Sequence, residues 1–172
     1  MLPLYLWILF IIIILQRIIE LFIAKRNEQW MKARGGIEKG QSHYKWFILL
    51  HTLFFCSLFV EIIIRDVTGF KLPYVLFIIF IITQVVRIWC ITALGRCWNT
   101  KIIISPDLPL VNKGPYKYVK HPNYIVVGIE LFVIPLLFGA YITAMVFPIL
   151  HMALLTIRIP YEEKALQKMI PK

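Results

Sequence analysis

The sequence contains a series of apolar runs, each close to the length that crosses a lipid bilayer. They cover residues 2–24, 46–64, 72–94, 122–138 and 141–159. A helix needs about 20 mainly apolar residues to cross the hydrocarbon core. A chain of 172 residues, 60% of them hydrophobic, cannot hide five such runs in a soluble domain. The sequence therefore predicts an all-α integral membrane protein with about five transmembrane helices, folded as one domain over residues 1–172.

The positive charges predict how these helices are oriented. Segments 25–45, 95–121 and 158–172 contain six, five and four Lys or Arg residues, whereas segment 65–71 contains two. Loops rich in Lys and Arg stay in the cytosol, so we expect the N-terminus outside and the C-terminus inside. Topology and anionic lipid headgroups then account for the net charge of +10, and no nucleic-acid partner is expected. The three cysteines form no ligand pattern, so no metal site is expected.

A polar motif precedes the fourth apolar run. Residues 110–124 read Leu-Val-Asn-Lys-Gly-Pro-Tyr-Lys-Tyr-Val-Lys-His-Pro-Asn-Tyr. Pro122 suits the first turn of a helix, which places Tyr116, His121 and Tyr124 at the mouth of that helix. The free N–H groups of a helix start attract a carboxylate, and the histidine and tyrosines add directional donors and acceptors. The alternative is an interfacial belt of tyrosines, which is common at membrane surfaces.

A second motif, Arg158-Ile-Pro-Tyr-Glu-Glu163, follows the last apolar run. Arg158 and Glu162 are four residues apart, so they share a face if the helix continues, although Pro160 is expected to stop or kink it. A guanidinium can bind an anionic oxygen at two points, and a carboxylate can bind an amine or ribose hydroxyls. The alternative is an ordinary ion pair beside the membrane.

Taken together, Gly114-Pro-Tyr116, Lys120-His-Pro-Asn-Tyr124 and Arg158-x-x-x-Glu-Glu163 resemble the isoprenylcysteine carboxyl methyltransferase family, over roughly residues 94–168. Lys120 departs from the family, which usually has Arg before His-Pro. The resemblance implies S-adenosylmethionine as the methyl donor and Arg158 as the residue that contacts the methyl acceptor. It implies cofactor binding by Leu108, Pro109, Leu110, Val111, Tyr116, His121, Pro122, Asn123, Tyr124 and Glu162.

The resemblance divides the domain into three N-terminal helices, residues 1–94, and a cofactor-binding and catalytic part, residues 95–172. The pocket is expected between the 95–124 loop and the C-terminal tail, on the cytosolic side. The expected reaction methylates an oxygen, carboxylate or enol, of a lipophilic acceptor such as an isoprenylcysteine-like compound. Segment 34–44 resembles a bacterial subgroup, some members of which are thought to methylate long-chain alkylpyrones, so an alkylpyrone is also considered.

Three other functions stay open from the sequence. They are methylation of a phospholipid nitrogen, transport across the membrane, and a nicotinamide-dependent reduction, which lacks the usual dinucleotide glycine fingerprint. Charged residues inside the apolar runs are expected to pair, to contact another helix or to reach the interface, and for Glu130 a structural hydrogen bond is expected, with contact to the acceptor as the alternative. These residues are Arg17, Glu20, Glu61, Arg87 and Glu130.

Overall fold

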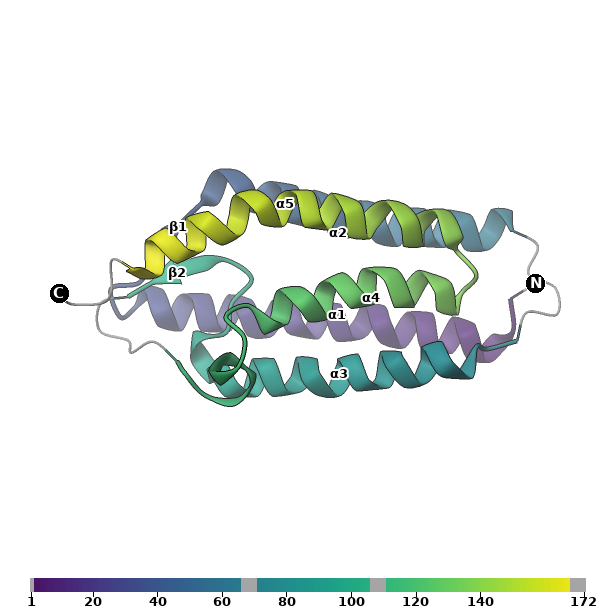
Figure 1. Ribbon diagram of the computed structural model, residues 1–172, viewed down its shortest axis with the longest axis horizontal. Helices are drawn as coiled ribbons and strands as arrows, with labels where there is room; N and C mark the ends of the chain where they lie inside the picture. The colour runs from purple at the N-terminus through teal and green to yellow at the C-terminus, as the bar shows by residue number, and fades with distance from the viewer. Residues whose placement is uncertain (1, 66–70, 106–110, 168–172) are drawn as a thin grey trace.

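Five α-helices of the described chain lie side by side along the long axis of the molecule (Figure 1). The computed structural model describes residues 2–65, 71–105 and 111–167. Apart from short elements, the chain is made of α1 (Leu4–Lys32), α2 (Gln41–Ile64), α3 (Tyr74–Leu94), α4 (Pro122–Leu137) and α5 (Tyr141–Gln167). The prediction of an all-α fold is confirmed.

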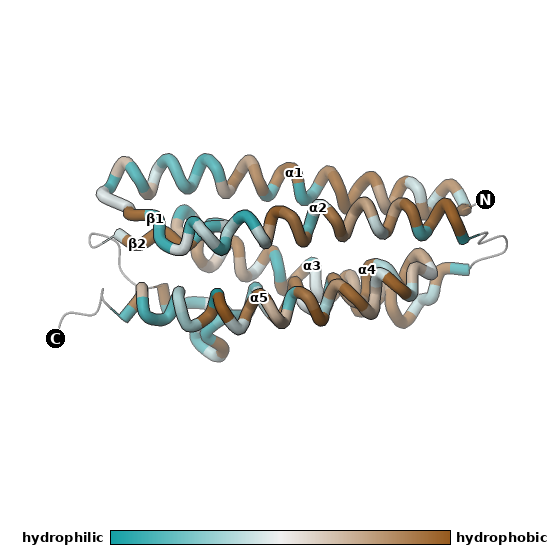
Figure 2. The backbone as a smooth tube through the Cα atoms, turned by 90° about the horizontal axis from the view of Figure 1, so that it is seen from above, coloured by the Kyte–Doolittle hydropathy of each residue, from teal (hydrophilic) through white to brown (hydrophobic). Residues whose placement is uncertain are grey.

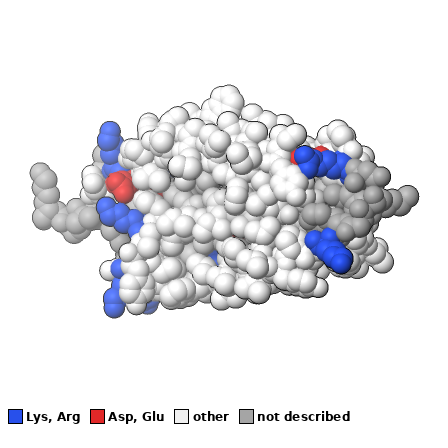
Figure 3. Space-filling model, turned by 45° about the vertical axis from the view of Figure 1, so that its right-hand side comes forward, with Lys and Arg blue, Asp and Glu red and all other residues white. Residues whose placement is uncertain are grey.

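The surface of this bundle is that of a membrane protein. Four helices, α1, α2, α3 and α5, are long and apolar enough to cross a bilayer, and α4 is a shorter apolar helix. Figure 2 shows that one end of the bundle is hydrophilic while most of its length is hydrophobic. In Figure 3, charged side chains gather at the two ends, with an uncharged surface between them. We call the hydrophilic end, where α1, α3 and α5 finish and α2 and α4 begin, the polar end.

Two helices extend further at the polar end than their apolar runs predict. Helix α1 continues from the apolar residues through the charged turns up to Lys32. Helix α5 was expected to stop or kink at Pro160, but it runs through this residue to Gln167. Proline removes one backbone hydrogen bond from a helix, and contacts made by Arg158 and Glu162 on either side hold the turn in place.

Helix α4 has 16 residues, or about 24 Å at 1.5 Å per residue. Figure 1 shows that α1 and α5 extend further toward the polar end than the first turn of α4 does. The motif at the start of α4 is therefore recessed within the bundle.

The polar segments are joined by a small sheet that the sequence did not predict. Strand β1 (Ile37–Lys39) pairs antiparallel with β2 (Ile102–Ile104), in a register that aligns Glu38 with Ile103. Strands of three residues are too short to show the alternation that marks a strand. Two short 3₁₀ helices, η1 (Gly95–Cys97) and η2 (Gly114–Lys117), lie in the connection between α3 and α4. The sheet ties the segment after α1 to the segment after α3.

Two arginines and two glutamates lie together inside the bundle, between α1, α3 and α4. Arg87 binds Glu20 through two contacts, Nε to Oε1 at 2.7 Å and Nη2 to Oε2 at 2.8 Å, and its Nη1 donates to Glu130. Arg17 lies 2.9 Å from Glu20 and 3.1 Å from Glu130. The side-chain amide of Gln16 also donates a hydrogen bond to Glu20, and that of Gln84 donates one to Glu130. The expected pairing of these four charges is confirmed.

Glu61 pairs with Arg65, as expected, at 3.6 Å. Its carboxylate also accepts hydrogen bonds from the backbone N–H groups of Ile142 and Thr143, at 3.0 and 2.9 Å. These are free donors of the first turn of α5, which a carboxylate stabilises in the same way as a capping side chain. Helix α2 thereby fixes where α5 begins.

Candidate functional site

The two motifs singled out in the sequence meet in a chain of hydrogen bonds at the polar end. The Tyr124 hydroxyl, at the start of α4, accepts a bond from Nε of Arg158 at 2.7 Å. The same hydroxyl donates to Oε2 of Glu162 at 2.5 Å. One tyrosine thus connects the cation and the carboxylate of α5, and both face the recessed start of α4.

His121 completes this group. Its ring stacks on that of Tyr124, with centroids 5.4 Å apart and an interplanar angle of 16°. Nδ1 lies 4.0 Å from Oε2 of Glu162, and Nε2 lies 3.4 Å from Oε1 of Glu163. The loop before α4 and the end of α5 are therefore in contact, as the sequence predicted.

Arg158 is held by individual residues to which the sequence assigned no role. Its Nη2 donates to the carbonyl oxygen of Thr100 at 2.6 Å, and its guanidinium carbon lies 4.8 Å from the ring centroid of Phe47. Tyr44, one turn before Phe47, bonds to the Thr100 hydroxyl at 3.0 Å. Among the described residues, Nη1 of Arg158 has no hydrogen-bond partner. The cation is buried, and one of its nitrogens is left for a further oxygen.

The start of α4 also presents unused hydrogen-bonding groups. The Oδ1 atom of Asn123 is buried and has no partner in the described part of the chain. Pro122 occupies the first turn, and the helix has no side-chain cap. A buried acceptor without a partner is costly, and the uncapped N–H groups favour an anion. This helix start is suited to a ligand with both donors and a carboxylate.

Tyr116 lies on η2, which packs against α3. Burial raises the pKa of its phenol above the ordinary value, and the charge of Glu162 adds to this shift. The phenol therefore stays protonated and able to donate. Gly114 lets η2 approach α3 closely: its φ is +55°, and a Cβ there would lie 2.9 Å from Cβ of Ala93 and from Nε1 of Trp89.

Gly114→Ala is therefore expected to push η2 away from α3 and to misplace Tyr116. The sequence resemblance implies that Tyr116 binds S-adenosylmethionine, and on that expectation its binding should weaken at least about tenfold, while the apolar bundle stays folded. Equilibrium binding of labelled S-adenosylmethionine measures the first effect, and circular dichroism checks the second. Gly95→Ala is the control. Gly95 also has a positive φ, but a Cβ there would meet no atom within 4 Å. Equal losses in both variants would contradict a role for the η2 contact.

The remaining predicted residues are less constrained. Val111 is half-buried, and Leu108, Pro109 and Leu110 lie outside the described residues. Sequence reasoning missed Phe47 and Thr100 as contacts of Arg158, and it gave Glu163 no role of its own. The position of Glu163 directly after Glu162 was the sequence feature that could have pointed to it. In the described ranges, no three His, Cys, Asp or Glu side chains are arranged to hold a metal ion.

The sequence of this chain is similar to a known family and to two bacterial proteins. Residues 75–168 match the model of the isoprenylcysteine carboxyl methyltransferase (ICMT) family. The uncharacterized protein YpbQ of Bacillus subtilis is 44% identical over 162 residues, covering 94% of this chain and 96% of that protein. An uncharacterized protein of Haemophilus influenzae is 28% identical over 170 residues, covering 98% and 99%. No solved structure matches.

The family match begins at residue 75, earlier than the motifs alone indicated, and so includes α3 as well as the site. It covers more than half of the chain and contains both motifs that meet at Tyr124. The chain therefore belongs to the isoprenylcysteine carboxyl methyltransferase family, a family of membrane methyltransferases.

Proposed function

We propose that this chain transfers a methyl group from S-adenosylmethionine to an oxygen, carboxylate or enolate, of a lipophilic acceptor. Membership of a methyltransferase family supports the reaction class. The observation that carries the proposal is the hydrogen-bonded chain from Glu162 through Tyr124 to Arg158. It places a carboxylate suited to the donor and a guanidinium suited to the acceptor on either side of one phenol.

The start of α4 would hold the donor. Glu162 and the unpartnered Oδ1 of Asn123 can accept bonds from an ammonium group or ribose hydroxyls. Tyr116 and the uncapped N–H groups that follow Pro122 can donate to a carboxylate. When bound, S-adenosylmethionine supplies a methyl group on a sulfonium sulfur, which keeps the bonding electron pair as the methyl leaves. Further residues proposed to line this pocket are Leu108, Pro109, Leu110, Val111 and His121.

Arg158 would bind the acceptor oxygen through Nη1. Because Tyr124 and the Thr100 carbonyl hold its other nitrogens, the free nitrogen points in a fixed direction. A carboxylate or an acidic enol is already ionised, so no strong base is required. The oxygen forms a bond to the methyl carbon and loses its negative charge. Arg158 then holds a neutral product less tightly, which favours release.

We also propose that the polar end faces the cytosol. The described parts of the three segments richest in Lys and Arg all lie at this end (Figure 1), and such segments stay inside. A water-soluble donor would then enter from the cytosol, and the apolar acceptor would approach from the bilayer. A site at the recessed start of α4 can be reached by both.

Two other candidate functions fit the described residues less well. A neutral amine, as in phospholipid N-methylation, would gain nothing from a buried guanidinium beside it. A transporter is expected to have polar groups inside the bilayer, and the network around Arg87 is such a group. The cavity between Arg87, Arg17 and His51 holds about 20 Å³, room for roughly one water molecule, and the four charges balance.

Incubation of the purified chain with methyl-labelled S-adenosylmethionine and candidate lipids tests the reaction. We expect label in the organic phase with a lipophilic carboxylic acid or a long-chain enol. Mild base releases the label from an ester and leaves an ether intact, so the product identifies the acceptor group. Label on a phospholipid amine would instead establish N-methylation. No label with any of these acceptors would contradict the proposal.

Removing donor contacts should weaken donor binding. We expect His121→Ala and Glu162→Gln each to raise the dissociation constant of S-adenosylmethionine at least about tenfold, because each removes a polar contact in a largely buried site. Isothermal titration in detergent measures this effect. Lys164→Gln is the control, since Lys164 is exposed on the last turn of α5. Unchanged affinity in both site variants would overturn the donor assignment.

A further inference from the structure

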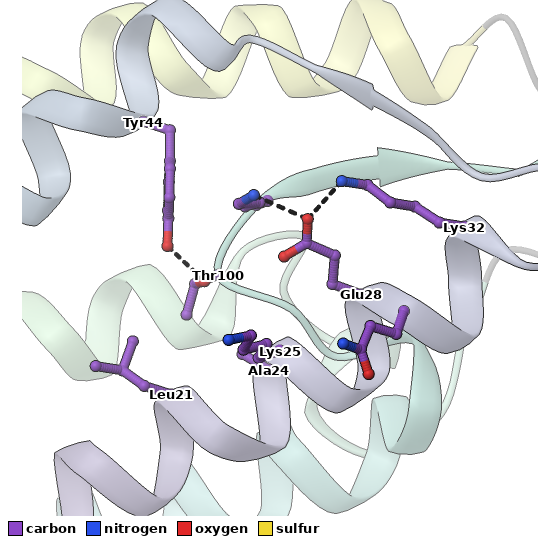
Figure 4. Close-up of a pocket in the computed structure, with 9 residues that line it drawn as sticks. Leu21, Ala24, Lys25, Glu28, Lys32, Tyr44 and Thr100 are labelled. Atoms are coloured by element: carbon purple, nitrogen blue, oxygen red, sulfur yellow. Dashed lines mark hydrogen bonds and ion pairs between the residues drawn. The ribbon is translucent and has the colours of Figure 1, made fainter.

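A cavity that adjoins the α4 site through Thr100 opens at the polar end beside α1. It has a volume of about 530 Å³, within the range of small-molecule sites. Figure 4 shows Glu28 and Lys25 on α1 facing Tyr44 and Thr100 across the space. The α1 residues that line it recur every three or four positions and so form one helix face. They are Leu21, Ala24, Lys25, Glu28, Gln29 and Lys32.

The charge of this cavity is positive. It is lined by Lys25, Lys32 and Lys101 against a single carboxylate, that of Glu28. Glu28 lies 2.5 Å from Lys32 and 2.8 Å from Lys101, and Glu38 lies behind the same two ammonium groups at 3.0 and 3.4 Å. The bond to Glu28 raises the pKa of Lys101, which stays charged. In the described chain, no carboxylate lies within ion-pair distance of Lys25.

The position of the cavity matches the depth of lipid headgroups. Leu21 belongs to the apolar part of α1 and Lys25 to its charged part, so the cavity lies across the border between them. Leu21 and Lys25 are both exposed on the outside of the bundle. At this depth the outside is lipid. Basic pockets between membrane helices near this border bind phosphate headgroups.

We propose that this cavity binds the phosphate of an anionic phospholipid, with Lys25 as the main cationic contact. Glu28 and Glu38 balance the charges of Lys101 and Lys32, which supply further N–H donors, so Lys25 is the unbalanced cation. Gln29 and Tyr44 supply further polar groups, and the acyl chains would lie along Leu21 in the bilayer. The exposed apolar side of the cavity favours a lipid over a free phosphate compound. Because Tyr44 and Thr100 line the cavity and Thr100 also holds Arg158, a bound lipid would steady the site. Lipid binding itself does not depend on methyl transfer.

Native mass spectrometry of the full chain tests this proposal. The protein is mixed with equal amounts of phosphatidylglycerol and phosphatidylcholine with identical acyl chains. We expect phosphatidylglycerol to be retained at least about fivefold over phosphatidylcholine, and Lys25→Gln to reduce its affinity about fivefold, the usual effect of one lysine near a lipid surface. Glu28→Gln should act in the opposite direction and increase retention, because it removes the negative charge from the cavity.

Lys45→Gln is the matched control. Lys45 is exposed at the same end of the bundle, on α2, and its ammonium group lies over Trp46, outside the lining of the cavity. It should retain phosphatidylglycerol as the unmodified chain does, and circular dichroism confirms folding of each variant. Equal losses in the Lys25 and Lys45 variants, or no preference for the anionic lipid, would overturn the proposal. Thermal stabilisation by inorganic phosphate without lipid retention would overturn the choice of a lipid.

Discussion

Methyl transfer by the Arg158→Lys variant is expected to fall about 100-fold, the cost of losing one well-placed donor to a reacting oxyanion. The lysine keeps the positive charge, but one ammonium group cannot bond to the Tyr124 hydroxyl, the Thr100 carbonyl and an acceptor at fixed angles. Arg158 makes the first two bonds with Nε and Nη2, which leaves Nη1 for the proposed bond to the acceptor. Geometry, and not charge alone, is therefore expected to determine the rate.

Initial rates with labelled donor measure this loss, and donor titration is the companion measurement. Donor affinity should change less than about threefold, because Glu162 and Asn123 are untouched. Arg26→Lys is the control, since Arg26 is an exposed residue of α1 and the same substitution there should leave the rate unchanged. A variant that loses donor affinity while keeping its maximal rate would place Arg158 at the donor and contradict its role at the acceptor.

The sequence predicted the bundle because crossing a bilayer requires a long apolar run, and such runs are visible without knowledge of contacts. Its errors lie at the polar end. Lys25 to Lys32 are too polar to extend an apolar run, yet α1 includes them. Pro160 predicts that the helix stops or kinks there, and α5 does not stop but continues to Gln167. In both places tertiary contacts, which no local pattern records, decide where the helix ends.

The site was predicted in part for a similar reason. His121, Tyr124, Arg158 and Glu162 belong to motifs whose polar residues stand out beside apolar helices, and the structure brings them together. Phe47 lies inside an apolar run and resembles its lipid-facing neighbours. Thr100 contributes a carbonyl, which every residue carries. Neither contact with Arg158 can be recognised from the sequence, although together they orient the guanidinium group of Arg158.

Charged side chains inside the bundle need partners of opposite charge, so removing one of them is expected to lower the stability of the protein strongly. Arg87→Met removes three contacts with Glu20 and Glu130 and leaves two buried carboxylates sharing Arg17. Breaking a buried ion pair by deleting one partner costs about 3–5 kcal/mol. We therefore expect Arg87→Met to be the most destabilising of the substitutions considered, with a melting temperature about 10 °C lower.

Thermal unfolding in one detergent compares this variant with Arg65→Met. Arg65 also pairs with a glutamate, at 3.6 Å, but its side chain is 42% exposed, so its loss should cost no more than about 1 kcal/mol. The double variant Arg87→Met with Glu20→Gln should be more stable than the sum of the single losses by at least about 1 kcal/mol, because it removes a carboxylate that Arg87 had balanced. Additive losses of stability in the double variant would mean that the four charges do not act as one network. Equal losses in the Arg87 and Arg65 variants would mean that burial does not determine how much stability an ion pair contributes.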